Sequence, residues 1–278
     1  MTRVVSGVAL AAVFFALIWF GNSTVLLFVA LAVGALAFQE FAEIVRALNV
    51  AVPRVPGLIA TLAAIFIVPF PYVPGEPLLG VALVVTAAVA MMRLAKAPVV
   101  AGSAQKADAS NFTPVVLGCI AAVFASVYIG LALGALVGVH IFGGRGAVVL
   151  LVATIAVSDT AQYYSGRMLG RHPLAPRLSP KKTIEGAVGG FVVAPIFLYF
   201  GGRYFVPAVD PLWTGALGFV LVAAGIAGDL FESMMKRAAD LKDSSALIPG
   251  HGGVLDRIDA LLFATPVFYL YLRWVYNA

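Results

Sequence analysis

Residues 233–259, SMMKRAADLKDSSALIPGHGGVLDRID, combine the residue types needed to bind phosphate and a divalent metal. The segment contains four Lys or Arg residues, four aspartates and one of the three histidines of the chain. Aspartate oxygens are hard ligands of the kind that Mg²⁺ takes together with substrate phosphates, and Lys and Arg bind phosphate oxygens directly. We therefore expect this segment to bind phosphate groups and a metal ion.

A polar helix face leads into this segment. Asp229, Ser233, Lys236 or Arg237, and Asp240 recur at spacings of three and four residues, which places them on one side of a helix. Asp229 still belongs to the apolar run that precedes the segment. We expect Asp229 to lie near an edge of the membrane, where the helix leaves it.

A Pro-Gly-His-Gly-Gly turn at 249–253 follows, and glycines such as Gly252 and Gly253 let the backbone approach a ligand closely. His251 has no second His or Cys at metal-ligand spacing, which argues against a zinc site. Three roles stay open for His251: general acid or base, hydrogen bonding to phosphate, and a structural role in the turn. Lys242, just before the turn, adds another phosphate-binding cation.

Two aspartates, Asp256 and Asp259, then open the last apolar run one helical turn apart, with Arg257 between them. Carboxylates at a helix N-terminus ordinarily complement the helix dipole, and that reading suffices for Asp259 alone. The alternative is metal binding, which the convergence of Asp229, Asp256 and Asp259 beside several cations favours.

A second charged segment, SPKKTIEG at 179–186, looks like a helix start with Ser179 as N-cap and Pro180 in the first turn. The free N–H groups of such a start favour an anion, and Lys181 and Lys182 lie in the same turn. A phosphate site and an anchor for lipid headgroups explain this pattern equally well.

Asp159 lies within an apolar run, where a lone carboxylate is costly and is a candidate for function. Helical spacing places Gln162 and Tyr163 on the same face. The alternative is a carboxylate that those neighbours satisfy as part of helix packing.

The elements that position these residues are membrane helices. The chain of 278 residues is 62% hydrophobic and 11% charged, and runs of about 20 apolar residues recur along it. These runs lack the alternation of a membrane barrel, so we predict an all-α, polytopic transmembrane helix bundle of about nine spans. The expected spans are 4–20, 24–41, 57–73, 78–95, 115–140, 147–166, 187–206, 213–230 and 259–276.

The distribution of cations gives this bundle an orientation. With nine spans, fifteen of the 18 Lys and Arg residues fall on the side of the N-terminus, and Arg145, Arg203 and Arg273 fall on the other. The positive-inside rule makes the first side cytoplasmic, together with both charged segments. The basic pI of about 9.4 therefore reports orientation and lipid headgroups, and we expect no nucleic-acid partner. There is also no Walker A or GxGxxG pattern.

The segment 233–259 resembles the signature of the phosphatidate cytidylyltransferase (CDP-diacylglycerol synthase) family almost position for position. The resemblance rests on Ser233, Lys236, Arg237, Lys242, Asp243, Pro249, His251, Gly252, Gly253, Asp256, Arg257 and Asp259. Upstream, SDTAQYYSGRMLGRHPLAPRLSPKKTIEG is similar to a second segment of that family. The N-terminal half resembles the family only in its hydrophobic helices.

The resemblance implies that CTP and phosphatidate react to give CDP-diacylglycerol and pyrophosphate at the cytoplasmic face of the cell inner membrane. It implies Mg²⁺ at Asp229 and Asp256, with K⁺ as a second cation, and Asp159 and Asp259 are further candidate ligands. The catalytic candidates are Asp229, Asp256, Lys236, Arg237 and His251. The candidates for substrate binding are Ser179, Lys181, Lys182, Thr183, Ser233, Lys242, Gly252, Gly253 and Arg257.

The resemblance also implies a homodimer. We expect N-terminal transmembrane helices at 1–140 and a catalytic region at 141–278. Two other functions stay open, a CTP-dependent polyprenol or lipid kinase and a membrane transporter. A transporter would place its polar residues along a path near the membrane midplane, whereas here they gather at one face.

Overall fold

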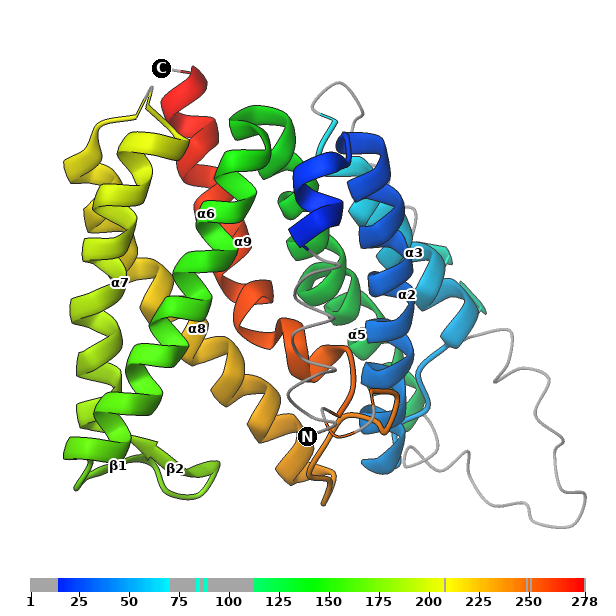
Figure 1. Cartoon of the computed structure of the whole chain (residues 1–278). Helices are drawn as coiled ribbons and strands as arrows, with labels where there is room; N and C mark the ends of the chain where they lie inside the picture. Colours follow the sequence, from blue (N-terminus) through cyan, green and yellow to red (C-terminus); the bar gives the residue numbers. More distant parts are fainter. Residues whose placement is uncertain are drawn as a thin grey trace, which may run out of the picture.

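The computed structural model describes residues 15–70, 84–85, 88–89, 113–207, 209–248, 250 and 252–277, and within these ranges the chain is mainly helical (Figure 1). The helices are α2 (Ser23–Ala47), α3 (Arg54–Ile67), α5 (Thr113–Ala125), a π-helical segment (Ser126–Leu131), α6 (Ala132–Leu169), α7 (Ile184–Phe205), α8 (Pro211–Ala238) and α9 (Leu255–Asn277). Between α6 and α7, β1 (Pro173–Ala175) and β2 (Ser179–Thr183) pair as a short antiparallel hairpin. The predicted all-α class is confirmed.

Five helical segments of the described part of the chain are long and apolar enough to cross a membrane. They are Ser23–Ala47, Thr113–Leu169, Ile184–Phe205, Pro211–Ala238 and Leu255–Tyr276. A shorter apolar helix, Arg54–Ile67, overlaps the expected third span, 57–73. The chain is thus an integral membrane protein. The expected spans 4–20 and 78–95 lie mostly outside the described residues, so the total of about nine stays a prediction.

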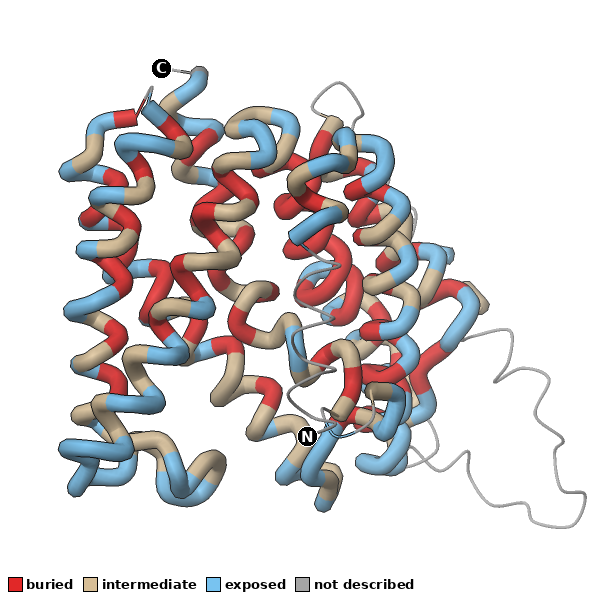
Figure 2. The backbone as a smooth tube through the Cα atoms, in the orientation of Figure 1, coloured by how far each residue is buried: buried red, intermediate tan, exposed pale blue. Residues whose placement is uncertain are grey.

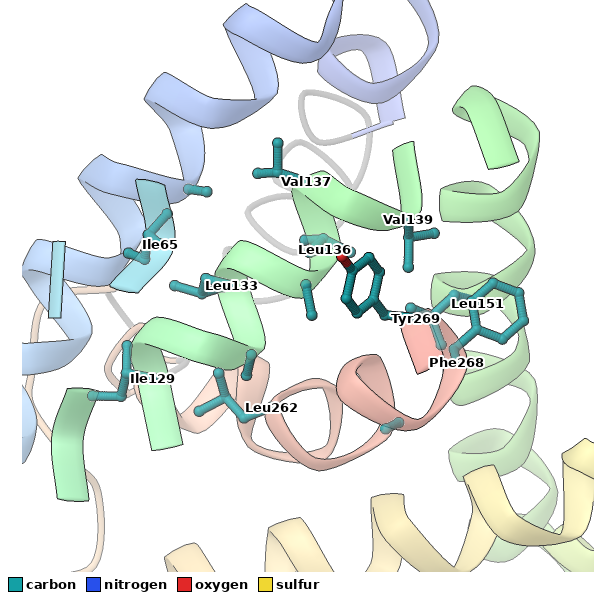
Figure 3. Packing of buried hydrophobic residues seen from close by; sticks show 14 of the residues in the cluster. Ile65, Ile129, Leu133, Leu136, Val137, Val139, Leu151, Leu262, Phe268 and Tyr269 are labelled. Carbon is teal, nitrogen blue, oxygen red and sulfur yellow. The ribbon is translucent and has the colours of Figure 1, made fainter. Parts of the chain in front are cut away.

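The long segment Thr113–Leu169 is interrupted at Gly144, where φ is 72° and ψ is −178°. Glycine reaches such a φ without the steric penalty of a side chain. The chain turns there, so the expected spans 115–140 and 147–166 lie on two separate helical stretches. Part of α6 before Gly144 packs against α3 and α9, as the close-up in Figure 3 shows.

The apolar core lies where these helices meet, and buried residues recur along the length of the bundle helices (Figure 2). Leu133 and Leu136 of α6 are buried in one cluster with Ile65 of α3 and with Leu262 and Phe268 of α9 (Figure 3). α6 also packs along α7, α7 along α8, and α8 along α9. Helix α9 thus contacts both the α6–α8 group and the π-helical segment beside α3.

The two charged segments of the sequence lie at the same end of the bundle. In Figure 1 the β1–β2 hairpin and the connection between α8 and α9 are both at the bottom, and the C-terminus is at the top. An ion pair between Lys182 of β2 and Asp229 of α8 ties the hairpin to this end. The helix order therefore brings together residues that are about 50 to 80 positions apart in the sequence.

Candidate active site

A buried lysine joins two carboxylates where α8 ends and α9 begins. The Nζ atom of Lys236 donates hydrogen bonds to Oε2 of Glu232 at 2.7 Å and to Oδ1 of Asp256 at 2.5 Å. The side chains of Lys236, Glu232 and Asp256 are 12%, 1% and 8% exposed. Charges this far removed from water are costly unless they are paired, so this arrangement is a strongly coupled unit.

The second oxygen of Asp256 is held by the loop between the two helices. Its Oδ2 atom accepts hydrogen bonds from the backbone N–H of Ser244 at 2.9 Å, the Ser244 hydroxyl at 2.8 Å and the backbone N–H of Gly253 at 2.8 Å. Both oxygens of Asp256 are therefore in use. The position of this predicted metal ligand depends on the loop as well as on α9.

Two glycines of the predicted turn explain how the loop closes around Asp256. Gly252 has a φ of 78°, in the left-handed region that favours glycine. A Cβ atom at Gly253 would run into the Ser244 hydroxyl and the Glu40 carboxylate. The backbone of this turn therefore does approach another group closely, as predicted. The groups that it approaches in this structure are protein side chains. His251 and Pro249 lie outside the described residues.

The predicted helix start at Ser179 is wrong. Residues 179–183 form β2, which pairs with β1, and α7 begins only at Ile184. Thr183 is the N-cap of α7, because its hydroxyl accepts a hydrogen bond from the backbone N–H of Gly186 at 3.1 Å. Pairing with β1 extends the backbone through Pro180 and the two lysines, so the cap falls four residues later than expected.

Glu185 in the first turn of α7 fixes the base of the hairpin. Its carboxylate accepts hydrogen bonds from the backbone N–H groups of Arg171 and His172, at 3.1 and 3.3 Å, and lies 2.6 Å from Nδ1 of His172. Glu185 and the Lys182–Asp229 pair both hold the base of the hairpin, because Lys182 is next to Thr183, which pairs with Pro173.

Lys182 and Asp229 form the second cation–carboxylate pair of the site, and their side chains are 24% and 36% exposed. The Ser233 hydroxyl donates to Oδ1 of Asp229 at 3.4 Å, one turn along α8. The predicted polar face of α8 is confirmed for these two residues. Lys182 joins them from a segment 47 residues earlier in the sequence than Asp229.

The two other predicted carboxylates lie near this pair. The side-chain amide of Gln162 donates to Oδ1 of Asp159 at 3.4 Å, as the helical spacing predicted. At Asp259 helix α9 packs closely against α8, because a Cβ atom at Gly228, next to Asp229, would run into the Asp259 carbonyl oxygen. The structure therefore places the backbone of Asp259 beside that of Asp229, while Asp159 lies on α6 with Gln162 as its neighbour.

The remaining predicted phosphate-binding cations, Lys181, Arg237, Lys242 and Arg257, are exposed around these pairs. An N–H of Arg237 donates to the carbonyl oxygen of Leu241 at 3.5 Å, just past the end of α8. Ser179 is half-buried in β2.

Sequence reasoning missed two glutamates of this site, Glu40 and Glu232. Glu232 lies one turn before Lys236, and the spacing of four residues between a Glu and a Lys is a signal that the sequence contains. Glu40 lies in the expected span 24–41, where a carboxylate inside an apolar run also marks a candidate. Glu40 accepts hydrogen bonds from the backbone N–H groups of Val254 and Leu255, at 2.9 and 2.7 Å, at the start of α9.

The donor set has the chemistry of a hard-cation site, because its groups are carboxylate oxygens together with hydroxyl and backbone groups. Glu232 adds an oxygen, Oε1, that is buried and has no hydrogen-bond partner among the described residues. Within the same ranges no group of three or more His, Cys, Asp or Glu side chains is arranged to hold a metal ion. Lysines, rather than a shared set of ligands, face Asp229 and Asp256 in this structure.

Residues 1–275 match the model of a family described as the cytidylyltransferase family. A phosphatidate cytidylyltransferase of Haemophilus influenzae is 46% identical over 134 residues, which cover 46% of each chain. An uncharacterized Escherichia coli protein, YnbB, is 39% identical over 135 residues, 49% of this chain and 45% of its own. A phosphatidate cytidylyltransferase of Bacillus subtilis is 29% identical over 274 residues, 97% of this chain and 96% of its own. The match spans about half the length of the first two relatives and nearly all of the third.

Proposed function

Because the chain belongs to the cytidylyltransferase family, we propose that it is an enzyme that converts CTP and phosphatidate into CDP-diacylglycerol and pyrophosphate. Two similar bacterial proteins, those of Haemophilus influenzae and Bacillus subtilis, are phosphatidate cytidylyltransferases by name. The observation that carries the proposal is the Lys182–Asp229 ion pair, which joins the charged hairpin to the end of α8 beside the Lys236–Asp256 pair. Groups suited to bind phosphate and groups suited to bind a metal ion thereby lie at one end of the bundle.

The reaction requires a phosphatidate oxygen to attack the α-phosphorus of CTP while the bond to the β-phosphate breaks and pyrophosphate leaves. Two anions must come together in line, so the main tasks are alignment and the neutralisation of charge. Lys182 and Lys236 are the best placed cations, because Lys182 pairs with Asp229 and Lys236 pairs with Glu232 and Asp256. We expect both to contact phosphate oxygens when CTP is bound, with Lys181, Arg237 and Arg257 at the exposed rim.

Mg²⁺ is the expected cofactor, held by Asp229 and Asp256, with Asp159 and Asp259 as further ligands and K⁺ as an additional cation. When bound, Mg²⁺ would neutralise the triphosphate and polarise its oxygens. The carboxylates of Asp229 and Asp256, each paired with a lysine, support this expectation through their chemistry. Asp256 is already oriented by Ser244 and Gly253, so one of its oxygens is held in place independently of Lys236.

We place the site at the cytoplasmic face of the cell inner membrane, with the N-terminus on the same side, and we expect a homodimer. The positive-inside rule supports the orientation, because both charged segments lie at one end of the bundle. Phosphatidate would then reach the site while its acyl chains stay in the bilayer. Light scattering of the protein in detergent, corrected for bound detergent, measures the oligomeric state.

The proposed activity is tested with purified protein, tritiated CTP, Mg²⁺ and phosphatidate. Formation of labelled CDP-diacylglycerol with an equal amount of pyrophosphate is the expected result. Absence of labelled lipid in an assay where the Bacillus subtilis relative is active would reject the proposal. Omitting phosphatidate is the control, because turnover without it would show only hydrolysis of CTP.

A further inference from the structure

Glu40 of α2 is a buried carboxylate that lies far in the sequence from the two charged segments 179–186 and 233–259. Its side chain binds the loop before α9. The residue is 6% exposed. Its Oε1 atom accepts hydrogen bonds from the Ser245 hydroxyl at 2.7 Å and the Val254 N–H at 2.9 Å. Its Oε2 atom accepts from the Ser244 hydroxyl at 3.0 Å and the Leu255 N–H at 2.7 Å. Four donors thus converge on one carboxylate.

These donors show what Glu40 does for the fold of the loop. The N–H groups at a helix start have no partner within the helix, and a negative charge there is stabilised by the helix dipole. Glu40 supplies both the acceptors and the charge for α9 from another helix, more than 200 positions away. Hydrogen bonds to a charged acceptor are stronger than those between neutral groups, so this contact is a firm anchor.

The same contact reaches Asp256 through Ser244. The Ser244 hydroxyl lies 3.0 Å from Oε2 of Glu40 and 2.8 Å from Oδ2 of Asp256. A hydroxyl has one proton to donate, so the two carboxylates share it. Asp256 also stands in the first turn of α9, one residue after Leu255, whose N–H Glu40 holds. Glu40 therefore controls two of the features that locate Asp256.

We propose that Glu40 is a positioning residue for the reaction: it sets the place of the Asp256 carboxylate through Ser244 and through the start of α9. This inference rests on the proposed function, in which Asp256 is catalytic. Helix α2, whose sequence contains no motif of the reaction, therefore helps to position the Asp256 carboxylate. Glu40 does so without a contact to substrate, because its two oxygens are occupied by protein donors.

The variants Glu40→Gln and Glu40→Ala test this role, with Glu43→Ala as the matched control. Glu43 lies one turn further along α2, is half exposed and pairs with Arg46 and Arg54 at the surface. For Glu40→Ala we expect kcat to fall about 100-fold, the loss that a misplacement of about 1 Å can cause, with KM for CTP nearly unchanged. Glu40→Gln keeps one acceptor oxygen and should fall between Glu40→Ala and the wild type.

A structural role alone would not produce this pattern. We expect Glu40→Gln to lose turnover at a thermal midpoint close to that of the wild type, and Glu43→Ala to retain wild-type kcat. Wild-type kcat in Glu40→Gln and Glu40→Ala, or an equal loss in Glu43→Ala, would overturn the proposal. If Glu40→Ala does not fold, the comparison of Glu40→Gln with Glu43→Ala decides.

Hydrogen–deuterium exchange provides a readout that does not depend on activity. In Glu40→Gln we expect faster exchange in peptides that cover 244–255, with unchanged exchange in α6 and α7. Unchanged exchange at 244–255 would overturn the positioning role. The two proposals also fail separately: an inactive wild-type protein rejects the proposed function, whereas an active wild type beside fully active Glu40 variants rejects only the role of Glu40.

Discussion

The Nζ atom of Lys236 lies 2.5 Å from Oδ1 of Asp256, although the two residues are 20 positions apart and belong to different helices. The pair joins the end of α8 to the start of α9. Asp256 is in turn held by Ser244 and Gly253, and Lys236 also pairs with Glu232. One chain of contacts therefore links the helix end, the loop and the next helix start.

Removing Lys236 should cost both stability and activity. In Lys236→Met the buried carboxylates of Glu232 and Asp256 would face each other without a cation, and breaking a buried ion pair in this way typically costs about 3 kcal/mol or more. We expect a lower free energy of unfolding in detergent and no measurable turnover. Reversible unfolding in SDS and the CTP assay measure the two effects.

A double variant separates the two losses. Adding Glu232→Gln to Lys236→Met removes one of the unpaired charges and should recover part of the stability without restoring turnover. A double variant as unstable as Lys236→Met would show that the unpaired carboxylates are not the cause.

Lys182 and Lys181 are adjacent lysines with different surroundings, and they provide a matched comparison. Lys182 pairs with Asp229, whereas Lys181 is exposed on β2. We expect Lys182→Ala to lower kcat/KM for CTP by about 100-fold, the effect of losing one preorganised charge contact. Lys181→Ala should have a much smaller effect. Equal losses in the two variants would favour a general role of the hairpin charge over a specific one for Lys182.

Asp229→Asn and Asp256→Asn should each abolish turnover while the protein stays folded in detergent. Chelation with EDTA should likewise stop the wild-type enzyme, and added Mg²⁺ should restore it. Replacing K⁺ in the assay buffer by choline tests the proposed second cation. We expect a slower reaction without K⁺. A near wild-type rate in either variant would remove that aspartate from the proposed metal site.

The predicted orientation is tested by labelling single cysteines in a Cys119→Ser background. Position 177, in the turn of the β1–β2 hairpin, should react with a membrane-impermeant maleimide only after intact cells are opened. Position 212, at the start of α8 and at the other end of the bundle, should react with the same maleimide in intact cells. The reverse pattern would place the site outside the cytoplasm.

The helical fold and the membrane character could be predicted because both follow from composition. Long apolar runs without alternation leave helices as the available structure, and this expectation is confirmed at α2, α7, α8 and α9. The division within Thr113–Leu169 was also predicted from its two apolar runs. The start of α7 was not, because Ser179 and Thr183 are both good N-caps and only the pairing of β2 with β1 decides between them.

The site could be predicted in part. Asp159 with Gln162, and Asp229 with Ser233, are neighbours at helical spacing, and the sequence is enough to place them together. The Lys182–Asp229 pair and the contact of Glu40 with Ser244 depend on how whole helices pack. No local pattern specifies a partner 204 positions away, so these relationships required the structure.

The most direct test of the account follows the phosphorus atoms of CTP. The purified protein is given phosphatidate, a polyprenol as a lipid alcohol, Mg²⁺ and CTP labelled with ³²P in either the α or the γ position. Cytidylyl transfer predicts that only the α label enters the lipid and that the γ label appears in pyrophosphate. Transfer of the γ label to a lipid alcohol would identify a kinase instead, and lipid free of both labels would contradict the proposed enzyme.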